Sequence, residues 1–505
     1  MINISCVGDA VVKYNIALFG TFNVENYGDL MFPVIFKRAM EKRGLDFNLV
    51  LFSPEKTCAK ALDDSTMVYA AEEIEAMHNQ RPFDAIVVGG GALVHYNQIA
   101  VKFPDSDNVV PYDITESWFY PVEFAARKNI KLIFNLPQIP YPFSKPFKNI
   151  SQAAFDSCEY ISFRDEISKT YLSDIYDDNP PDIKVFPDAV CCISDLIDSI
   201  ELSKIKENIL GFDKKYAVIQ FNPQKPEADD EYLLKIIEKL KNSNLTVVLL
   251  PIGYTHNDDS ILDDFNKKYN ANCTIIKKKL NIIETAAVLS DCEIYIGSSF
   301  HGAITAIAYG KKAISYNYIY PKNKNQEIFR MYNVSNFVVE NAKDAYTILE
   351  NLLDNKIGFV PKLDEVQKQV DLHFDNIYSL ITNADNTKKR NYDQFRRSFV
   401  KILPEIALLE QENKRLLNSL NSQTEYSNKL ESTVSEYIAE AKKCQKYISD
   451  LERNNKEQNE YIKNLESALN STQENLNSLQ LDYARIRNNF FVRVLLFIKR
   501  ILTKK

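Results

Sequence analysis

Short apolar runs alternate with helical patterns over the first two-thirds of this 505-residue chain, and no other feature restricts the possible folds as strongly. The segments YNIALFGTF, FNLVLFS, FDAIVVGGGALV, IKLIFNLP and CEYISFRD read as strands, and helical patterns such as DLMFPVIFKRAMEKRG lie between them. Strands that alternate with helices pair in parallel, and the helices cover the faces of the sheet. We therefore expect an α/β fold.

A second series of the same kind begins near Lys214. KKYAVIQFNP, LTVVLLPIG and CEIYIG read as strands, while DEYLLKIIEKLKN and NIIETAAVLSD read as helices. Two such series predict two doubly wound, Rossmann-like domains that face each other across a cleft. We place the N-terminal domain at 1–200, the C-terminal domain at 201–385 and a helical linker at 386–405. Ligands of such sheets bind beyond the carboxyl ends of the strands, so we expect the site there.

The pattern changes to heptads after Pro404. With Ile406 as position a, the 3-4 spacing of the seam continues to Ile486 without a stutter, which predicts a left-handed coiled coil over 406–488. At 1.5 Å per residue this rod would be about 120 Å long. Asn413 and Asn455 fall at a positions, which favours a parallel homodimer. A single solvated helix is the alternative, because several seam positions are polar.

The last residues, NNFFVRVLLFIKRILTKK, combine a wide apolar surface with basic side chains only. The segment is too short and too charged to span a membrane. It is typical of a helix that lies on an anionic membrane surface, and we predict this arrangement for 489–505. A helix that packs on its own protein is the alternative, and it leaves the all-basic composition unexplained.

Composition excludes some classes of function. The net charge of −7 argues against general binding of nucleic acid. The eight cysteines form no C-x-x-C pair and have no histidine at ligand spacing, which predicts reduced thiols and no metal site. MINISCVGDAVV lacks the features of a signal peptide, and no apolar run is long enough to span a bilayer. We expect a cytoplasmic protein, peripheral on the inner face of the cell membrane.

Two glycine-containing segments follow predicted strands. In NYGD, Gly28 permits a close approach of the backbone, while Asn26 and Asp29 could cap the next helix or bind a sugar hydroxyl. The run of three glycines after AIVV offers backbone N–H groups to an anion, although a tight turn explains it equally well. This run matches neither the dinucleotide fingerprint nor the P-loop. It comprises Gly89, Gly90 and Gly91.

Two further segments carry titratable residues. Arg164 ends a strand in SFRDEISKTYL, a position suited to bidentate contact with phosphate or carboxylate. A surface ion pair with Asp165 or Glu166 is the alternative. In IGSSFHGAITAIAYGKKA, His301 lies between a strand and a helix, where it could act as a general acid or base beside an anion. A tight turn with a helix-capping serine is the alternative there.

Together, the ordered segments NYGD, DAIVVGGG, FRDEISKTYL, PDAV and IGSSFHGAITAIAYGKKAISYNY resemble the polysaccharide pyruvyl transferase family, from Asn15 to Val334. The resemblance implies two domains of the GT-B type and no cofactor. It also implies transfer of the enolpyruvyl unit of phosphoenolpyruvate to sugar hydroxyls, with formation of a ketal and release of phosphate. The acceptor would be a bacterial cell-surface or exopolysaccharide, including one built on a lipid carrier.

Matched residue by residue, the resemblance makes His301 and Arg164 the catalytic residues. Many members of the family read Arg-Leu-His where this chain has Ser299-Phe300-His301, so the charge of that arginine is missing here. A glycosyltransferase that uses a nucleotide sugar, or a catalytically silent coiled-coil scaffold, is the alternative function. The predicted substrate-binding residues are Asn26, Gly28, Asp29, Gly89, Gly90, Gly91, Ser298, Ser299, Gly302 and Lys322.

Overall fold

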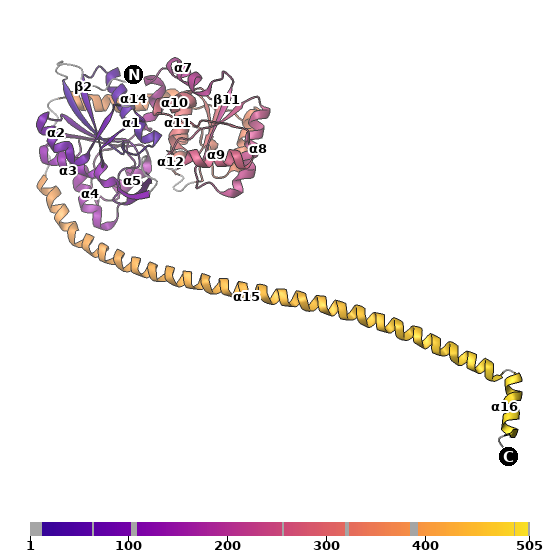
Figure 1. Ribbon diagram of the computed structural model, residues 1–505. Helices are drawn as coiled ribbons and strands as arrows, with labels where there is room; N and C mark the ends of the chain where they lie inside the picture. Colours follow the sequence, from indigo (N-terminus) through magenta and orange to yellow (C-terminus); the bar gives the residue numbers. More distant parts are fainter. Residues whose placement is uncertain are drawn as a thin grey trace. The chain divides into compact units, whose positions relative to one another are not determined.

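The computed structural model describes residues 13–62, 65–102, 109–254, 257–318, 323–383, 392–488 and 490–502. The chain divides into two compact units, Met1–Ile406 and Ala407–Lys505. Every strand that the structure describes lies in the first unit (Figure 1). We call the two sheets of this unit, each with its covering helices, the N-terminal and C-terminal α/β domains.

The N-terminal α/β domain is built on an eight-stranded sheet. Its strands are β1 (Tyr14–Phe19), β2 (Phe47–Ser53), β3 (Thr57–Cys58), β4 (Met67–Ala70), β5 (Ala85–Gly89), β8 (Lys131–Asn135), β9 (Tyr160–Phe163) and β10 (Ile183–Val185). Their order is β10-β9-β8-β5-β1-β2-β4-β3, and every pair except β3–β4 is parallel. Ile16 and Leu18 belong to one hydrophobic core, and Ala17 and Phe19 to another. Because alternate residues of a strand face opposite sides, the sheet is buried on both faces.

The C-terminal α/β domain contains a six-stranded sheet. Its strands are β11 (Tyr216–Gln220), β12 (Thr246–Leu249), β13 (Thr274–Ile275), β14 (Ile294–Gly297), β15 (Lys312–Tyr316) and β16 (Val338–Val339). Their order is β13-β12-β11-β14-β15-β16, and all neighbours are parallel. The prediction of two doubly wound α/β series is therefore confirmed. A short antiparallel pair, β6 (Gln98–Lys102) and β7 (Val109–Asp113), was not predicted.

Helices cover the two sheets, and several begin at a residue whose side chain accepts a hydrogen bond from the first turn. In the first unit they are α1 (Tyr27–Lys42), α2 (Ile74–Gln80), α3 (Phe119–Lys128), α4 (Lys148–Asp156), α5 (Glu166–Ser173), α6 (Ile193–Leu196), α7 (Ser199–Leu210), α8 (Asp230–Asn242), α9 (Asp258–Lys268), α10 (Ile282–Ser290), α11 (Phe300–Ala308), α12 (Asn323–Met331), α13 (Ala342–Leu353) and α14 (Leu363–Thr382). The 3-10 helix η4 (Ala189–Cys192) lies between β10 and α6.

Helix α14 returns from the C-terminal sheet to the N-terminal α/β domain. The His373 side chain in this helix is fully buried, with Nε2 2.7 Å from Oδ1 of Asn135 and Nδ1 3.0 Å from the hydroxyl of Tyr160. Lys131 Nζ donates to the carbonyl of Leu380 at 2.8 Å. This helix lies in the range predicted for the C-terminal domain, yet these contacts are with strands of the N-terminal sheet. An amphipathic pattern shows which face of a helix is apolar, but it does not show which sheet that face covers.

The long helix α15 (Tyr392–Asn488) starts within the predicted linker and continues for 97 residues. Its first turns pack on the N-terminal α/β domain. The Tyr392 hydroxyl donates to Glu123 at 2.9 Å, and the buried Phe395 ring lies 5.3 Å from that of Phe119. Residues 392–405 of the predicted linker therefore form the beginning of the long helix, and residues 386–391 lie outside the described residues.

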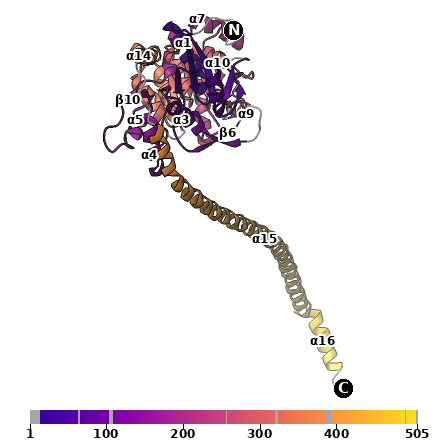
Figure 2. The same ribbon diagram turned by 90° about the vertical axis from the view of Figure 1, so that its left-hand side faces the viewer.

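The second unit contains the rest of α15 and the helix α16 (Phe490–Leu502) (Figures 1 and 2). Nearly all described side chains of α15 between 411 and 485 are exposed in the single chain. None of the described helices is long and apolar enough to cross a membrane. The helical prediction for 406–488 is confirmed, and its pairing into a coiled coil stays a prediction.

Candidate active site

Most of the predicted site residues follow strands at the centres of the two sheets, while Arg164 follows β9. The N-terminal sheet changes direction between β1 and β5, and the C-terminal sheet changes direction between β11 and β14. Asn26 and Gly28 follow β1, Gly90 follows β5, and Ser299 and His301 follow β14. Switch points of this kind are where doubly wound sheets bind their ligands. The topology thus brings these residues of the N-terminal domain and those of the C-terminal domain to the places where a site is expected.

His301 lies in the first turn of α11 and is packed against the N-terminal α/β domain. Its side chain is almost buried, and its Nε2 atom is 3.5 Å from Oδ2 of Asp188. Its ring meets that of Phe32 edge to face, with ring centroids 5.8 Å apart. A Cβ atom placed on Gly28 would lie 1.8 Å from Nδ1, so only glycine leaves room for the imidazole there. The part of the predicted cleft around His301 is therefore filled by side chains of both domains.

Arg164 follows β9 and is only 5% exposed. Its Nη1 atom donates to Oδ2 of Asp188 at 2.9 Å, and Nη2 donates to Oε1 of Gln138 at 2.9 Å. The guanidinium also lies 4.8 Å from the centre of the Phe300 ring, which belongs to the C-terminal domain. The alternative of a surface ion pair with Asp165 or Glu166 is wrong, because the partner is the buried Asp188.

Asp188 is the member of this cluster that the sequence did not reveal. It is fully buried between Arg164 and His301, and its Oδ1 atom accepts from the backbone N–H of Val190 at 3.0 Å. Burial alone would raise the pKa of Asp188, but the positive charges of His301 and Arg164 hold it at about 2. The only sequence signal was one acidic residue before the apolar run AVCCI, within the motif PDAV.

Two buried nitrogens of this cluster are unpartnered. Among the described residues, neither Nε of Arg164 nor Nε2 of His301 has a hydrogen-bond partner. Leaving a buried polar atom without a partner costs about 1–3 kcal/mol, and such atoms in a native protein call for an explanation. An anionic ligand would supply an acceptor for Nε of Arg164, and a small closure of the 3.5 Å gap to Asp188 would supply one for Nε2 of His301. We therefore take His301, Arg164 and Asp188 as the candidate active site.

Gly89 ends β5, and Gly90 and Gly91, which follow it, pack closely on α1. Gly90 and Gly91 have φ angles of 84° and 71°, a left-handed region that favours glycine. A Cβ atom on Gly90 would lie 2.1 Å from the Phe32 ring, and one on Gly91 would lie 2.7 Å from Oδ1 of Asp29. A Cβ atom on Gly89 would be 2.9 Å from the side-chain amide nitrogen of Asn135, in β8. These contacts support a tight, closely packed turn, while anion binding by this loop stays a prediction.

The NYGD segment joins the two α/β domains. Asn26 caps α1, because its side chain accepts from the Gly28 N–H at 3.1 Å. The Tyr27 hydroxyl lies 2.8 Å from that of Thr305 in α11. An ion pair connects Glu25 with Lys279 in the C-terminal domain. The capping interpretation of Asn26 is confirmed, and the segment also holds α11 in place.

The serines before His301 orient α11. Gln220, at the end of β11, accepts from the backbone N–H groups of Ser298 and Ser299 at 3.0 and 2.9 Å. The Ser299 hydroxyl accepts from the N–H of Gly302 at 3.2 Å, so the alternative interpretation of a helix-capping serine is confirmed, and substrate binding by Ser299 stays a prediction. Gly302 has no room for a side chain, since a Cβ atom would lie 2.8 Å from the Tyr295 hydroxyl. The predicted binding residue Lys322 lies outside the described residues.

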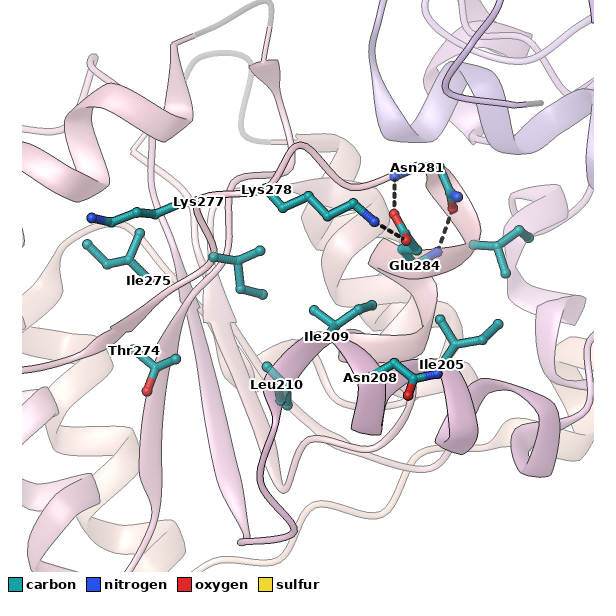
Figure 3. A pocket seen from close by; sticks show the side chains of 12 residues that line it. Ile205, Asn208, Ile209, Leu210, Thr274, Ile275, Lys277, Lys278, Asn281 and Glu284 are labelled. Atoms are coloured by element: carbon teal, nitrogen blue, oxygen red, sulfur yellow. Dashed lines mark hydrogen bonds and ion pairs between the residues drawn. The ribbon is translucent and has the colours of Figure 1, made fainter. Parts of the chain in front are cut away.

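A pocket of about 480 Å³ lies elsewhere in the C-terminal domain (Figure 3). It is lined by residues of α7, by β13 and by the segment that leads into α10, and it shares none of them with the His301 cluster. Glu284 accepts from Lys278 at 2.7 Å and from the backbone of Asn281 at 2.9 Å (Figure 3). These polar groups satisfy one another as a helix cap, so the pocket presents no comparable candidate chemistry.

The family model described as polysaccharide pyruvyl transferase matches residues 26–320, a range that contains every predicted site residue except Lys322. No curated protein matches the chain. Solved structures with some similarity include the UDP-GlcNAc 2-epimerase of Methanocaldococcus jannaschii, which is 14% identical with a TM-score of 0.48 and covers 72% of this chain and 99% of its own. The heptosyltransferase II of E. coli is 11% identical with a TM-score of 0.38, covering 68% and 99%.

Proposed function

The chain belongs to the polysaccharide pyruvyl transferase family, and from this premise we propose that it transfers a pyruvyl group from phosphoenolpyruvate to a saccharide, as a ketal. The observation that carries the proposal is the buried cluster of His301, Arg164 and Asp188, in which two nitrogens lack partners among the described residues. Phosphoenolpyruvate is a small molecule with two anionic groups and a carbon that must be protonated. A cation and a titratable imidazole side by side suit both needs.

In the proposed reaction, protonated His301 gives its proton to C3 of phosphoenolpyruvate. A sugar hydroxyl attacks C2 and forms the first C–O bond, after which the bond from C2 to the phosphate oxygen breaks. A second hydroxyl of the acceptor then attacks C2 and closes the ketal. The two hydroxyl protons are taken up by the imidazole and the departing phosphate, so atoms and charge balance. General acid catalysis of this kind contributes about 10²- to 10⁴-fold to the rate.

Arg164 is the proposed donor-binding cation. Its two Nη atoms are engaged, while the free Nε–H can donate to a carboxylate or phosphate oxygen. Ser299 caps α11 and carries no charge at the position where many family members have an arginine. The charge of Arg164 should therefore be indispensable for donor binding in this chain.

Thermal unfolding with candidate donors tests this assignment, because a ligand that binds only the folded protein raises the unfolding temperature. We expect phosphoenolpyruvate to stabilise the wild type and to have no effect on the Arg164→Gln variant. A response to a nucleoside diphosphate alone would favour a glycosyltransferase. A response to neither would favour a catalytically silent scaffold.

We further propose that the chain forms a homodimer through the heptads of α15. Seam residues such as Leu416, Ile448 and Ile462 are about half exposed or more in the single chain, and a second copy would cover the same seam. In sedimentation experiments the wild type should be a dimer, and the double variant Ile448→Glu, Ile462→Glu a monomer. Changes outside the seam, Ser449→Glu with Lys463→Glu, serve as the control. A monomeric wild type would contradict the proposal.

Helix α16 is proposed to bind an anionic membrane, where a lipid-linked acceptor would be presented at the inner face. Leu495 and Phe497 are exposed, while Arg493, Lys499 and Arg500 are the charged side chains of this helix. We expect the protein to float with anionic vesicles and not with neutral ones. Each basic residue contributes about 1 kcal/mol, so changing these three to glutamine should weaken binding ~100-fold. Equal flotation of this variant and the wild type would exclude the electrostatic contribution.

A further inference from the structure

We propose that Asp188 is the positioning residue of this active site: one fixed carboxylate oxygen directs Arg164 toward the anionic donor and stabilises the protonated form of His301. The inference rests on the proposed function and adds to it the group that prepares the acid for proton transfer. The carboxylate and the arginine come from the N-terminal domain, while the histidine comes from the C-terminal domain.

The carboxylate of Asp188 is immobile because each oxygen has its own task. Oδ1 accepts from the Val190 N–H at the start of η4, as a helix cap does. Oδ2 accepts from Nη1 of Arg164 at 2.9 Å and lies 3.5 Å from Nε2 of His301. The second distance exceeds that of a hydrogen bond, and catalytic hydrogen bonds often shorten only once substrate is bound. Oδ2 is thus positioned to serve both residues.

The guanidinium group of Arg164 is held in an orientation that leaves one of its N–H groups available for a hydrogen bond to substrate. Asp188 holds Nη1, Gln138 holds Nη2, and the Phe300 ring lies 4.8 Å from the guanidinium carbon. Because the guanidinium group is planar and rigid, fixing both Nη atoms also fixes the direction of the Nε–H bond. That N–H has no partner among the described residues. The arrangement therefore presents one fixed N–H group that can donate a hydrogen bond to an oxygen of phosphoenolpyruvate.

For His301, Asp188 determines which nitrogen is available for chemistry. A carboxylate oxygen accepts and does not donate, so it favours a proton on Nε2. In the protonated ring, Nδ1 then carries the second proton. Nδ1 packs closely on the backbone of Gly28, where even a Cβ atom would lie 1.8 Å away. Gly28 belongs to the NYGD segment, which lies at the switch point of the N-terminal sheet. Because Asp188 lies beside Nε2 and favours a proton there, we assign the proton that leaves to Nδ1.

Charged groups near the ring are few among the described residues. Burial raises the pKa of Tyr27 in α1, of Cys191 and Cys192 in η4, and of Tyr332 after α12, so these groups are uncharged near neutral pH. The helices α6 and α10 carry Asp195 and Glu284, and β15 carries Lys312; no ion pair connects these with His301. Asp29 of α1 is the other carboxylate close to Gly28, and it lies toward Gly91. Among these groups, Asp188 is the one that pairs with His301.

The Asp188→Asn variant tests this, because the amide keeps the shape and the oxygen that caps η4 but loses the charge and the oxygen that accepts from Arg164. We expect kcat for phosphate release from phosphoenolpyruvate to fall about 100-fold, within the range of general acid catalysis. The pH above which the rate declines should move to lower values, since the imidazole would lose its proton more readily. Asp165→Asn is the matched control: Asp165 is also buried and caps α5 through the Ser168 N–H at 2.7 Å. It should leave that pH unchanged.

A measurement without substrate separates this inference from the proposed function. The ¹⁵N resonances of the imidazoles can be followed against pH, since the chain has five histidines and the His301→Gln variant identifies the signal. The titration of His301 should move to lower pH in Asp188→Asn, and by less in Asp29→Asn. An identical titration in wild type and Asp188→Asn, or a larger effect of Asp29→Asn, would overturn the inference. A wild type that does not turn over phosphoenolpyruvate would refute the proposed function alone.

Discussion

The His301→Gln variant should lose pyruvyl transfer almost completely, with turnover reduced about 10²- to 10⁴-fold. Glutamine has a similar length and can still contact Asp188, but it cannot give up a proton to C3 of the donor. Because the imidazole is nearly buried between α11 and Phe32, other groups have little room to replace it. Phosphate release from phosphoenolpyruvate in the presence of a saccharide acceptor measures the effect.

The control for this variant is Thr305→Val in the same helix. Its hydroxyl lies 2.8 Å from that of Tyr27, so the change removes a contact between the two α/β domains without touching the acid. Thr305→Val should lower the unfolding temperature, and it should leave the rate of phosphate release close to that of the wild type. If His301→Gln retained transfer at a rate near that of Thr305→Val, the histidine would have no part in the chemistry.

The second large effect is a loss of stability on acidification, caused by His373. Burial, together with the charge of Arg43, lowers the pKa of this histidine to about 3. An unfolded histidine titrates near pH 6.5, so between these values the unfolded chain binds a proton that the folded chain does not. Stability should therefore fall as the pH drops below about 6.5, by up to about 1.4 kcal/mol per pH unit. At pH 5 the loss should be about 2 kcal/mol.

Urea unfolding at pH 7.5 and pH 5 measures this loss. The single tryptophan, Trp118, is fully buried in the N-terminal α/β domain and reports on the domain that His373 supports. His373→Gln is the matched variant, because an amide can also donate to Asn135 and accept from the Tyr160 hydroxyl. The variant should lose less stability between the two pH values than the wild type. An equal loss would show that His373 is not the group responsible.

The sequence predicted those features that depend on local pattern. The alternation of apolar runs and helices predicted both parallel sheets, and Arg164 and His301 stood out because each follows a strand. The capping roles proposed for Asn26 and Ser299 were also visible, since a cap depends on residues two or three positions away.

Features that depend on distant parts of the chain could not be predicted. The role of Asp188 requires that it meet both Arg164 and His301, which come from different domains. The buried His373 is 238 residues from Asn135, and the amphipathic pattern of its helix fits either sheet. Lone acidic and histidine residues in apolar surroundings give no sign of their partners, so their roles became visible only with the fold.

The most direct test of pyruvyl transfer is phosphate release from phosphoenolpyruvate by the full-length protein, with and without saccharides extracted from its host. We predict release that depends on the saccharide, that is lost in His301→Gln, and that yields an acceptor carrying a pyruvyl ketal in its mass spectrum. Release of a nucleoside diphosphate from a nucleotide sugar, with no phosphate released from phosphoenolpyruvate, would contradict it.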